Sequence, residues 1–335
     1  MSQPLADEPV ALEDLAFYLA VKHVGEQQEI AATTAAGLSL LWPILRFGEL
    51  DETTPAWLHA STLQAEQQFR VSEQVAFEYV QGAKWAAEPL SDPLVKIDTE
   101  FPVRDFQLAM RATGPAAVKK ATSTTFAAPG GDSGALSGRS GQSIPEGDLG
   151  SLVDELMGWG KLNSTGAGVK FALNGGRGEV EQLVAADAAE RIRERKPVGY
   201  ARFTEDSATG PCYFCAVLAS QGAVYLAKGA FNASNRKFVG DGPAKVHDHC
   251  KCQLRPVYSR DDKYDERARF FLKQWSDSPG GLKEFRRRYV RPEPYPEEPP
   301  VDLAAVRRNR DLVADRLGEQ APQVAWFNRQ LKQLA

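Results

Sequence analysis

All four cysteines of this 335-residue chain, and two of its four histidines, fall within residues 209–258. One pair has the spacing Cys-x-x-Cys, and the second pair, which follows after 34 residues, has the spacing Cys-x-Cys with two histidines just before it. The six candidate ligands are Cys212, Cys215, His247, His249, Cys250 and Cys252. Thiolate and imidazole are the ligands that zinc prefers, and two closely spaced pairs are typical of one tetrahedral zinc site.

The spacing within each pair explains how the ligands could converge. Two intervening residues let both thiolates of the first pair point into one tight turn, and an extended Cys-x-Cys places two sulfurs on one side of the chain. Zinc needs four ligands, so we expect Cys212, Cys215 and Cys250, with either Cys252 or His247 as the fourth. The sequence leaves that choice open. Metal binding would supply on the order of 10 kcal/mol of folding free energy to a segment too small to bury a core of its own.

Other interpretations of the cysteines carry less weight. No secretory signal opens the sequence and the chain is poor in cysteine, so two disulfides are not expected. A thioredoxin-like pair would not need the second cluster, and four unrelated buried cysteines would not gather in one stretch. A catalytic zinc with an open position, served by Glu205, Asp206 or Asp248 as a base, is an alternative to the structural zinc that we favour.

The same segment carries a family resemblance. Its motifs are Arg-Phe-Thr at 202–204, Gly-Pro-Cys-x-x-Cys, Leu-Ala-Ser-x-Gly-x-x-Tyr, and a closing His-x-x-Cys-x-Cys followed by Pro-Val-Tyr. Residues 199–258 thereby resemble the core of phage minor capsid proteins related to the Mu F head-morphogenesis family, which in actinobacterial phages are often labelled MuF-like or capsid maturation proteases. A weaker resemblance covers Thr113 to Ala121 and Leu173 to Asp187.

The resemblance implies a function in head assembly. It implies a minor capsid protein that binds portal, capsid or scaffold proteins, located in the phage head or, during assembly, in the host cytoplasm. The alternative that it implies is a capsid maturation protease that cleaves scaffold or capsid proteins. The residues themselves identify no catalytic group, because no Gly-x-Ser-x-Gly, His-Glu-x-x-His or Walker motif is present and His23 and His59 fall in predicted helices.

Composition and length limit the remaining classes. With 43% hydrophobic and 25% charged residues, the chain is typical of a folded protein of more than one domain. A net charge of −4 does not fit a surface devoted wholly to nucleic acid. The uncharged run from Ala31 to Leu45 is too short and too polar to span a bilayer, so we expect a buried helix that ends near Pro43 and no membrane contact.

We expect an α+β protein with a mainly α-helical N-terminal region, a small zinc-stabilised αβ module and a helical C-terminal tail. The predicted divisions are a helical N-terminal domain at 1–121, a flexible Gly/Ser linker at 122–150, a helical lead-in at 151–198, the Cys/His zinc module at 199–260, basic-aromatic helices at 261–291, and a Pro-rich spacer with a terminal helix at 292–335. Helix signals cover 11–46, 54–87, 103–112, 116–122, 152–159 and 180–195. Thr53 and Thr54 before Pro55 predict a helix start, and Asn163 to Gly168 predict a break in the lead-in.

The C-terminal part suggests contacts with other molecules. Two amphipathic stretches, 264–275 and 282–290, interleave aromatic with basic residues, which would suit a DNA contact or, as a weaker alternative, a zinc-ribbon DNA-binding protein. A proline-rich spacer follows at 291–300. The terminal helix carries one apolar stripe, made of Leu303, Val306, Val313 and Leu317, which we expect to be exposed and to dock on a head partner such as the portal, or else on the main body of the chain.

Overall fold

The computed structural model describes residues 12–126, 146–193, 199–204, 211–222, 251–258, 264–293 and 301–335. Within these ranges the chain is predominantly helical, as the sequence predicts. The helices are α1 (Glu13–Leu41), α2 (Leu50–Ala87), α3 (Val103–Thr113), α4 (Pro115–Phe126), α5 (Glu146–Arg193), α6 (Tyr213–Ala219), α7 (Glu266–Ser276), α8 (Gly281–Arg288), α9 (Leu303–Leu317) and α10 (Pro322–Gln333). Two short 3₁₀ turns cover Trp42–Ile44 and Phe47–Glu49, and two strands cover β1 (Gly199–Phe203) and β2 (Gln253–Val257). The predicted domain boundaries stay predictions.

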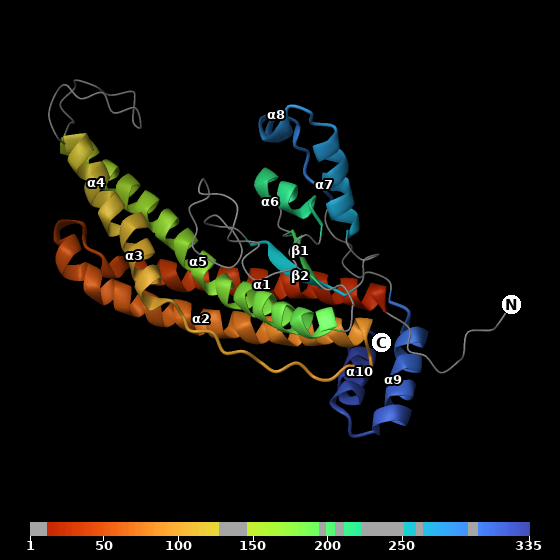
Figure 1. The fold of residues 1–335 in the computed structure, drawn as a ribbon. Coiled ribbons are helices and arrows are strands. Elements are labelled where there is room, and N and C mark those ends of the chain that lie inside the picture. The colour runs from red at the N-terminus through yellow and green to blue at the C-terminus, as the bar shows by residue number, and fades with distance from the viewer. Residues whose placement is uncertain are drawn as a thin grey trace.

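Three long helices, α1, α2 and α5, lie side by side and form the body of the molecule (Figure 1). At one end of this bundle α3 and α4 join α5, and at the other end the C-terminal helices α9 and α10 pack (Figure 1). Among the described residues no single helix is long and apolar enough to span a membrane. The bent pair Glu13–Ile44 and Phe47–Ala87, which meet at 78°, would pass such a test by length and composition only.

The turn between α1 and α2 confirms one prediction and corrects another. α1 ends at Leu41, where Pro43 redirects the chain as expected. α2 begins earlier than predicted, at Leu50, because Leu50 is buried in one cluster with Trp42 and Trp57. Thr53 and Thr54 are therefore not capping residues. Their hydroxyls donate hydrogen bonds one turn back, to the carbonyls of Glu49 and Leu50.

The break predicted between Asn163 and Gly168 is wrong, because α5 continues through it. The small residues in this part of α5 allow neighbouring elements to approach closely. Gly160 lies against Trp42 and Gly168 lies against Leu38, so closely that a methyl group at either position would collide with a neighbouring side chain. Glycine within a helix costs about 1 kcal/mol relative to alanine, and here it permits a close approach of α1 to α5.

The closest approach of α5 to α2 occurs at Gly175 and Gly176. A Cβ at Gly175 would lie 2.3 Å from the backbone oxygen of Phe69, and one at Gly176 would lie 2.7 Å from the Ser72 hydroxyl. The Gly176 amide donates a hydrogen bond to that hydroxyl at 2.9 Å. The two helix backbones are thus in contact without intervening side chains.

Replacing Gly175 with alanine is expected to lower the free energy of unfolding by about 2 kcal/mol, because the methyl group must push α5 away from the α2 backbone. Chemical denaturation with circular dichroism detection measures this. Gly158→Ala, where nothing lies within 4 Å of the added Cβ, is the matched control and should not destabilise the fold. Equal effects of the two substitutions would contradict the contact between backbones.

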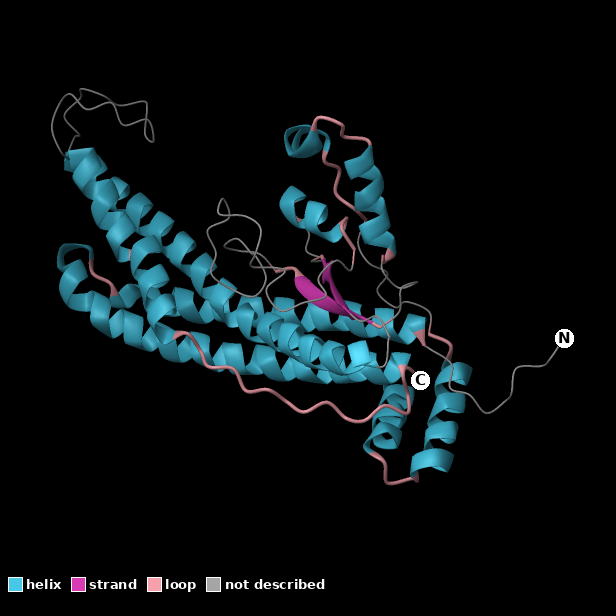
Figure 2. Cartoon of the chain, in the orientation of Figure 1, coloured by secondary structure: helices cyan, strands magenta, loops and turns pink. Residues whose placement is uncertain are grey.

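The chain from 88 to 102, which we call the strap, has no regular secondary structure and runs back along the bundle from the end of α2 to the start of α3 (Figure 2). Its last residues bury Phe101 against Phe69 and Phe106. Its first part is held by the indole of Trp85, whose Nε1 donates to the Ser91 carbonyl at 3.2 Å.

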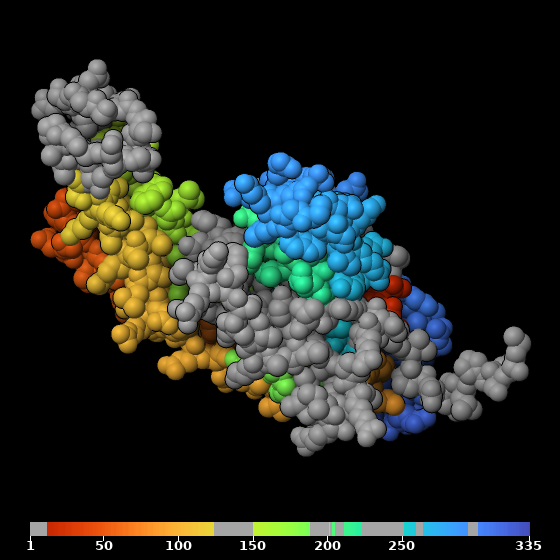
Figure 3. Space-filling view, turned by 45° about the horizontal axis from the view of Figure 1, so that its top comes forward, coloured from red at the N-terminus to blue at the C-terminus, as the bar shows by residue number. Residues whose placement is uncertain are grey.

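The two strands form one antiparallel pair in which Gly199 lies opposite Val257 and Phe203 lies opposite Gln253. Phe203 packs edge-on against Phe17 of α1, with ring centroids 6.1 Å apart, so the pair rests on the bundle. Helices α6, α7 and α8 lie beyond it, and α7 and α8 cover α6 in the space-filling view (Figure 3).

Candidate metal centre

Three of the candidate ligands fall on the elements around the strand pair. Cys212 is the residue before α6, and its Sγ accepts a hydrogen bond from the Cys215 amide at 3.4 Å. This bond closes the tight turn that the Cys-x-x-Cys spacing predicts. Cys252 immediately precedes β2.

Two of these three cysteines are buried, and the third is partly buried. Cys215 and Cys252 belong to one buried cluster, which also contains Phe203 and Leu254, and Cys212 packs against it. Among the described cysteines none forms a disulfide. The cysteines also affect the neighbouring Tyr289. Burial raises the pKa of this side chain, and the negative charges of the cysteine thiolates raise it further.

The remaining candidates, His247, His249 and Cys250, lie outside the described residues, as do the alternative bases Glu205, Asp206 and Asp248. Within the described ranges, no three His, Cys, Asp or Glu side chains form a group that could hold a metal ion. The donor chemistry of the described cysteines fits zinc, and a complete site would need a ligand from the segment 247–250. Which four residues bind the metal stays a prediction.

Two hydrogen bonds that the sequence analysis missed fix the backbone beside the cysteines. The side chain of Arg177 is fully buried in α5, and its Nε donates to the Cys252 carbonyl at 3.0 Å. On the opposite side, the Tyr289 hydroxyl donates to the Pro211 carbonyl at 2.7 Å. Arg177 of α5 thus holds Cys252, and Tyr289, the residue after α8, holds the carbonyl of the residue before Cys212. An arginine within the Asn-Gly-Gly-Arg run of α5 was the available signal for the first bond.

Removing the Tyr289 hydroxyl should loosen the first pair. Tyr289→Phe keeps the ring packed on Phe271 and Phe285 and deletes only the donor to Pro211. We expect zinc affinity to fall roughly tenfold, because partners outside the ligand shell orient the ligands. Competition with a colorimetric chelator measures the affinity. Tyr18→Phe, on α1, is the control, and equal affinity in all three proteins would contradict the orienting role.

The basic-aromatic helices differ from the expectation of a nucleic-acid surface. Phe271 and Phe285 are buried and, with Trp275 and Tyr289, join α7 and α8 to α6. The Arg286 guanidinium lies over the Tyr213 ring, 5.2 Å from its centroid. Most of the aromatic rings therefore form a small core and cannot serve as stacking platforms for bases. A DNA contact through the exposed basic residues stays a prediction.

The C-terminal stripe is not exposed as predicted. Val306 and Val313 are fully buried, and only Leu317 is largely exposed, at 47%. The reason is α10, which the sequence analysis missed: it pairs with α9 and places Trp326 against Gly82 and Trp85 of α2. The terminal helices dock on the body of their own chain. The spacer residues 294–300 lie outside the described ranges.

One comparison with known proteins matches the part of the chain that contains the candidate ligands. Residues 175–276 match the family described as VG15 protein, a family of phage gene products. The matched segment runs from the α2–α5 contact through the strand pair, α6 and α7, and it contains all the candidate ligands. No curated protein and no solved structure matches the chain.

Proposed function

We propose that the protein is a minor head protein of a tailed phage, of the MuF-like type, which acts in head assembly by binding portal and capsid or scaffold proteins. The observation that supports this most is the position of the phage-family match: it spans the cysteine pairs together with the elements that hold them. The motif resemblance of residues 199–258 points to the same class. The virion is the corresponding location.

In this proposal zinc is a structural component of residues 199–258. Cys212, Cys215 and Cys250 would hold it with Cys252 or His247, and the bound ion would hold the two cysteine pairs together. A thiolate-rich shell donates much negative charge to the metal, which favours a closed structural site over a Lewis acid. Arg177 and Tyr289 hold the carbonyls next to the ligands and so reduce the motion of both pairs.

The test uses the phage that encodes the chain. Mass spectrometry of purified heads should detect the intact protein, and the tagged protein should co-purify with the portal. Cys215→Ser should be lost from heads. Gly175→Ala, which weakens the bundle without touching a cysteine, is the matched control and should still be incorporated.

Two results would contradict the proposal. One is the absence of the protein from heads at every stage of assembly. The other is normal incorporation of Cys215→Ser. Cleavage of scaffold or capsid protein by the purified chain would favour the maturation protease instead.

A further inference from the structure

The strap covers a layer of buried polar side chains in the middle of the bundle. Along α1, α2 and α5 this layer falls between two apolar clusters, and it contains the side chains of Gln27, Ser72, Glu73 and Glu179. Neither carboxyl group is accessible to solvent, since Glu73 and Glu179 are both 0% exposed. Burying an ionised carboxylate is costly unless charges or hydrogen bonds compensate it.

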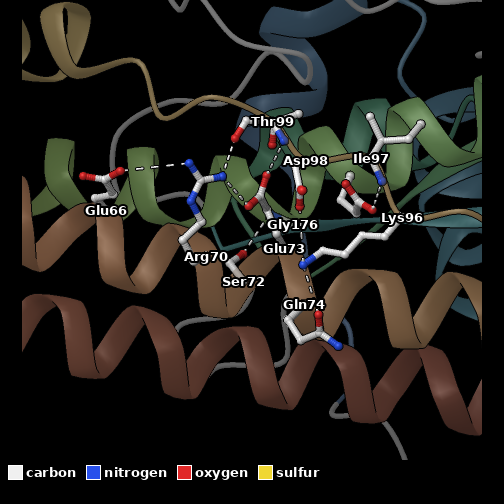
Figure 4. Close-up of polar contacts among 11 residues, drawn as sticks. Glu66, Arg70, Ser72, Glu73, Gln74, Lys96, Ile97, Asp98, Thr99 and Gly176 are labelled. Carbon is white, nitrogen blue, oxygen red and sulfur yellow. Dashed lines mark hydrogen bonds and ion pairs between the residues drawn. The ribbon is translucent and has the colours of Figure 1, made fainter.

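The strap binds both carboxyl groups through its backbone (Figure 4). The Thr99 amide donates to Glu73 Oε1 at 3.1 Å, and the Ile97 amide donates to Glu179 Oε1 at 3.4 Å. Arg70 bridges the strap and α2, because it bonds both Glu73 Oε2, at 2.9 Å, and the Thr99 carbonyl. These bonds and the Arg70 charge oppose the effect of burial on Glu73, although burial still raises the pKa of this carboxyl group.

The burial of the Glu179 carboxylate is offset by fewer hydrogen bonds. Its second oxygen, Oε2, is buried and has no hydrogen-bond partner among the described residues. Burial, together with the smaller effects of the Glu73 and Asp98 charges, raises the pKa of Glu179 to about 7, against the opposing effects of the Ile97 amide and Lys96. The protonated form of Glu179 therefore predominates below about pH 7 while the strap covers it.

The charged groups around Glu179 come from two neighbouring elements. α2 supplies Glu73 and Arg70, and the strap supplies Lys96 and Asp98. The Lys96 ammonium group does not act on Glu179 alone. Its Nζ donates a hydrogen bond to Gln74 Oε1 at 3.1 Å and lies 3.8 Å from Asp98 Oδ1. Gln27 of α1 also belongs to the layer. Its side chain accepts a hydrogen bond from the Ser72 hydroxyl and carries no charge.

We propose that the strap is a proton-linked latch, which stays closed over Glu179 while this carboxyl group is protonated and opens more often when it is ionised. Opening admits water to Glu179 and removes the desolvation that disfavours its charge. The ionised form therefore favours the open strap, although its bond to the Ile97 amide is lost there. This inference is independent of the zinc site.

The direction of the pH effect follows from linkage. In the closed state the pKa of Glu179 is about 7, and in an open, hydrated state it returns towards the ordinary value of 4.5. The opening equilibrium therefore shifts towards the open strap as pH rises from about 4.5 to about 7, and it becomes constant at higher pH. Because Gln323 of α10 bonds the Ser91 carbonyl at 3.0 Å, the C-terminal helices are attached to the element that moves.

Hydrogen exchange of single strap amides, corrected for intrinsic exchange, tests the latch in the full-length protein. Between pH 5 and pH 7 the protection of Ile97 and Thr99 should fall tenfold or more. Leu45, in the turn between α1 and α2 and outside the strap, is an internal control, since its amide donates to the Trp42 carbonyl at 3.0 Å. Its protection should change much less over the same range.

Glu179→Gln should abolish the pH dependence at Ile97 and Thr99, because the neutral amide keeps the volume and the acceptor but not the titration. Equal pH dependence of Leu45 and Ile97 in the wild-type protein would overturn the latch, as would a Glu179→Gln protein that keeps the wild-type response. Addition of magnesium or calcium should leave the profile unchanged. A shift of the midpoint by either ion would mean that the two carboxyl groups bind a cation, and it would likewise overturn the proposal.

Discussion

Cys215→Ser is expected to release the metal from the chain and to unfold residues 199–258, with the loss of on the order of 10 kcal/mol of metal-derived folding free energy. The effect should extend into the bundle. Cys215 and Cys252 share a buried cluster with Leu15 and Val80, so the strand pair and one end of α1 and α2 support each other. Exchange measured by mass spectrometry should show loss of protection there, and not in the apolar cluster around Trp57 and Phe106.

The wild-type protein treated with a strong chelator is the control for this substitution. It should show the same pattern of lost protection, because both treatments remove the same bound ion. A chelated protein that keeps full protection around β1 and β2 would show that metal does not hold this region. The serine would then act through packing alone.

Removal of His23 is expected to flatten the acid side of the stability profile. His23 is 1% exposed and stacks on Tyr79, with ring centroids 4.4 Å apart, and neither ring nitrogen has a hydrogen-bond partner among the described residues. Burial lowers the pKa of His23 from 6.5 to about 3. The protein keeps this histidine neutral, whereas the unfolded chain protonates it below pH 6.5.

The sign follows from this depressed pKa. The stability contribution is complete above pH 6.5 and is lost as pH falls towards 3, at about 1.4 kcal/mol per pH unit. His23→Phe keeps the ring stack but cannot titrate, so between pH 6.5 and pH 5 it should lose about 2 kcal/mol less than the wild type. Urea denaturation at a series of pH values measures the difference.

A second variant separates titration from packing. His23→Gln fills a similar volume without a titrating ring, and it should show the same reduced slope even if its absolute stability differs. A slope that changes in only one of the two variants would assign the effect to packing. A wild-type slope in both would mean that His23 is hydrated in the folded protein.

The sequence predicts the elements whose signals are local. Pro43 ends α1 as expected, and Gly222 follows shortly after α6 with a φ of 64°. Asp302 caps the start of α9, because its side chain accepts hydrogen bonds from the amides of Ala304 and Ala305. Each of these signals acts within one turn of the chain, and a single sequence contains all of the information required.

Features that depend on neighbouring elements could not be predicted in this way. The glycines of α5 resemble a break until α1 and α2 are seen to lie against them. Glu73 and Glu179 resemble a solvated helix face, because only the position of the strap shows that they are buried. Pro322, at the first turn of α10, was a local signal for this helix. The burial of the apolar stripe of α9 depends instead on α10, whose Trp326 packs against α2.

The central claim is that residues 199–258 are organised around one structural zinc ion. Elemental analysis combined with native mass spectrometry of the full-length protein, purified without oxygen and without added metal, tests it most directly. We predict about one zinc per chain in the wild type and almost none in Cys215→Ser. A wild-type protein that is folded and free of metal, or one whose cysteines are joined in disulfides, would contradict the account.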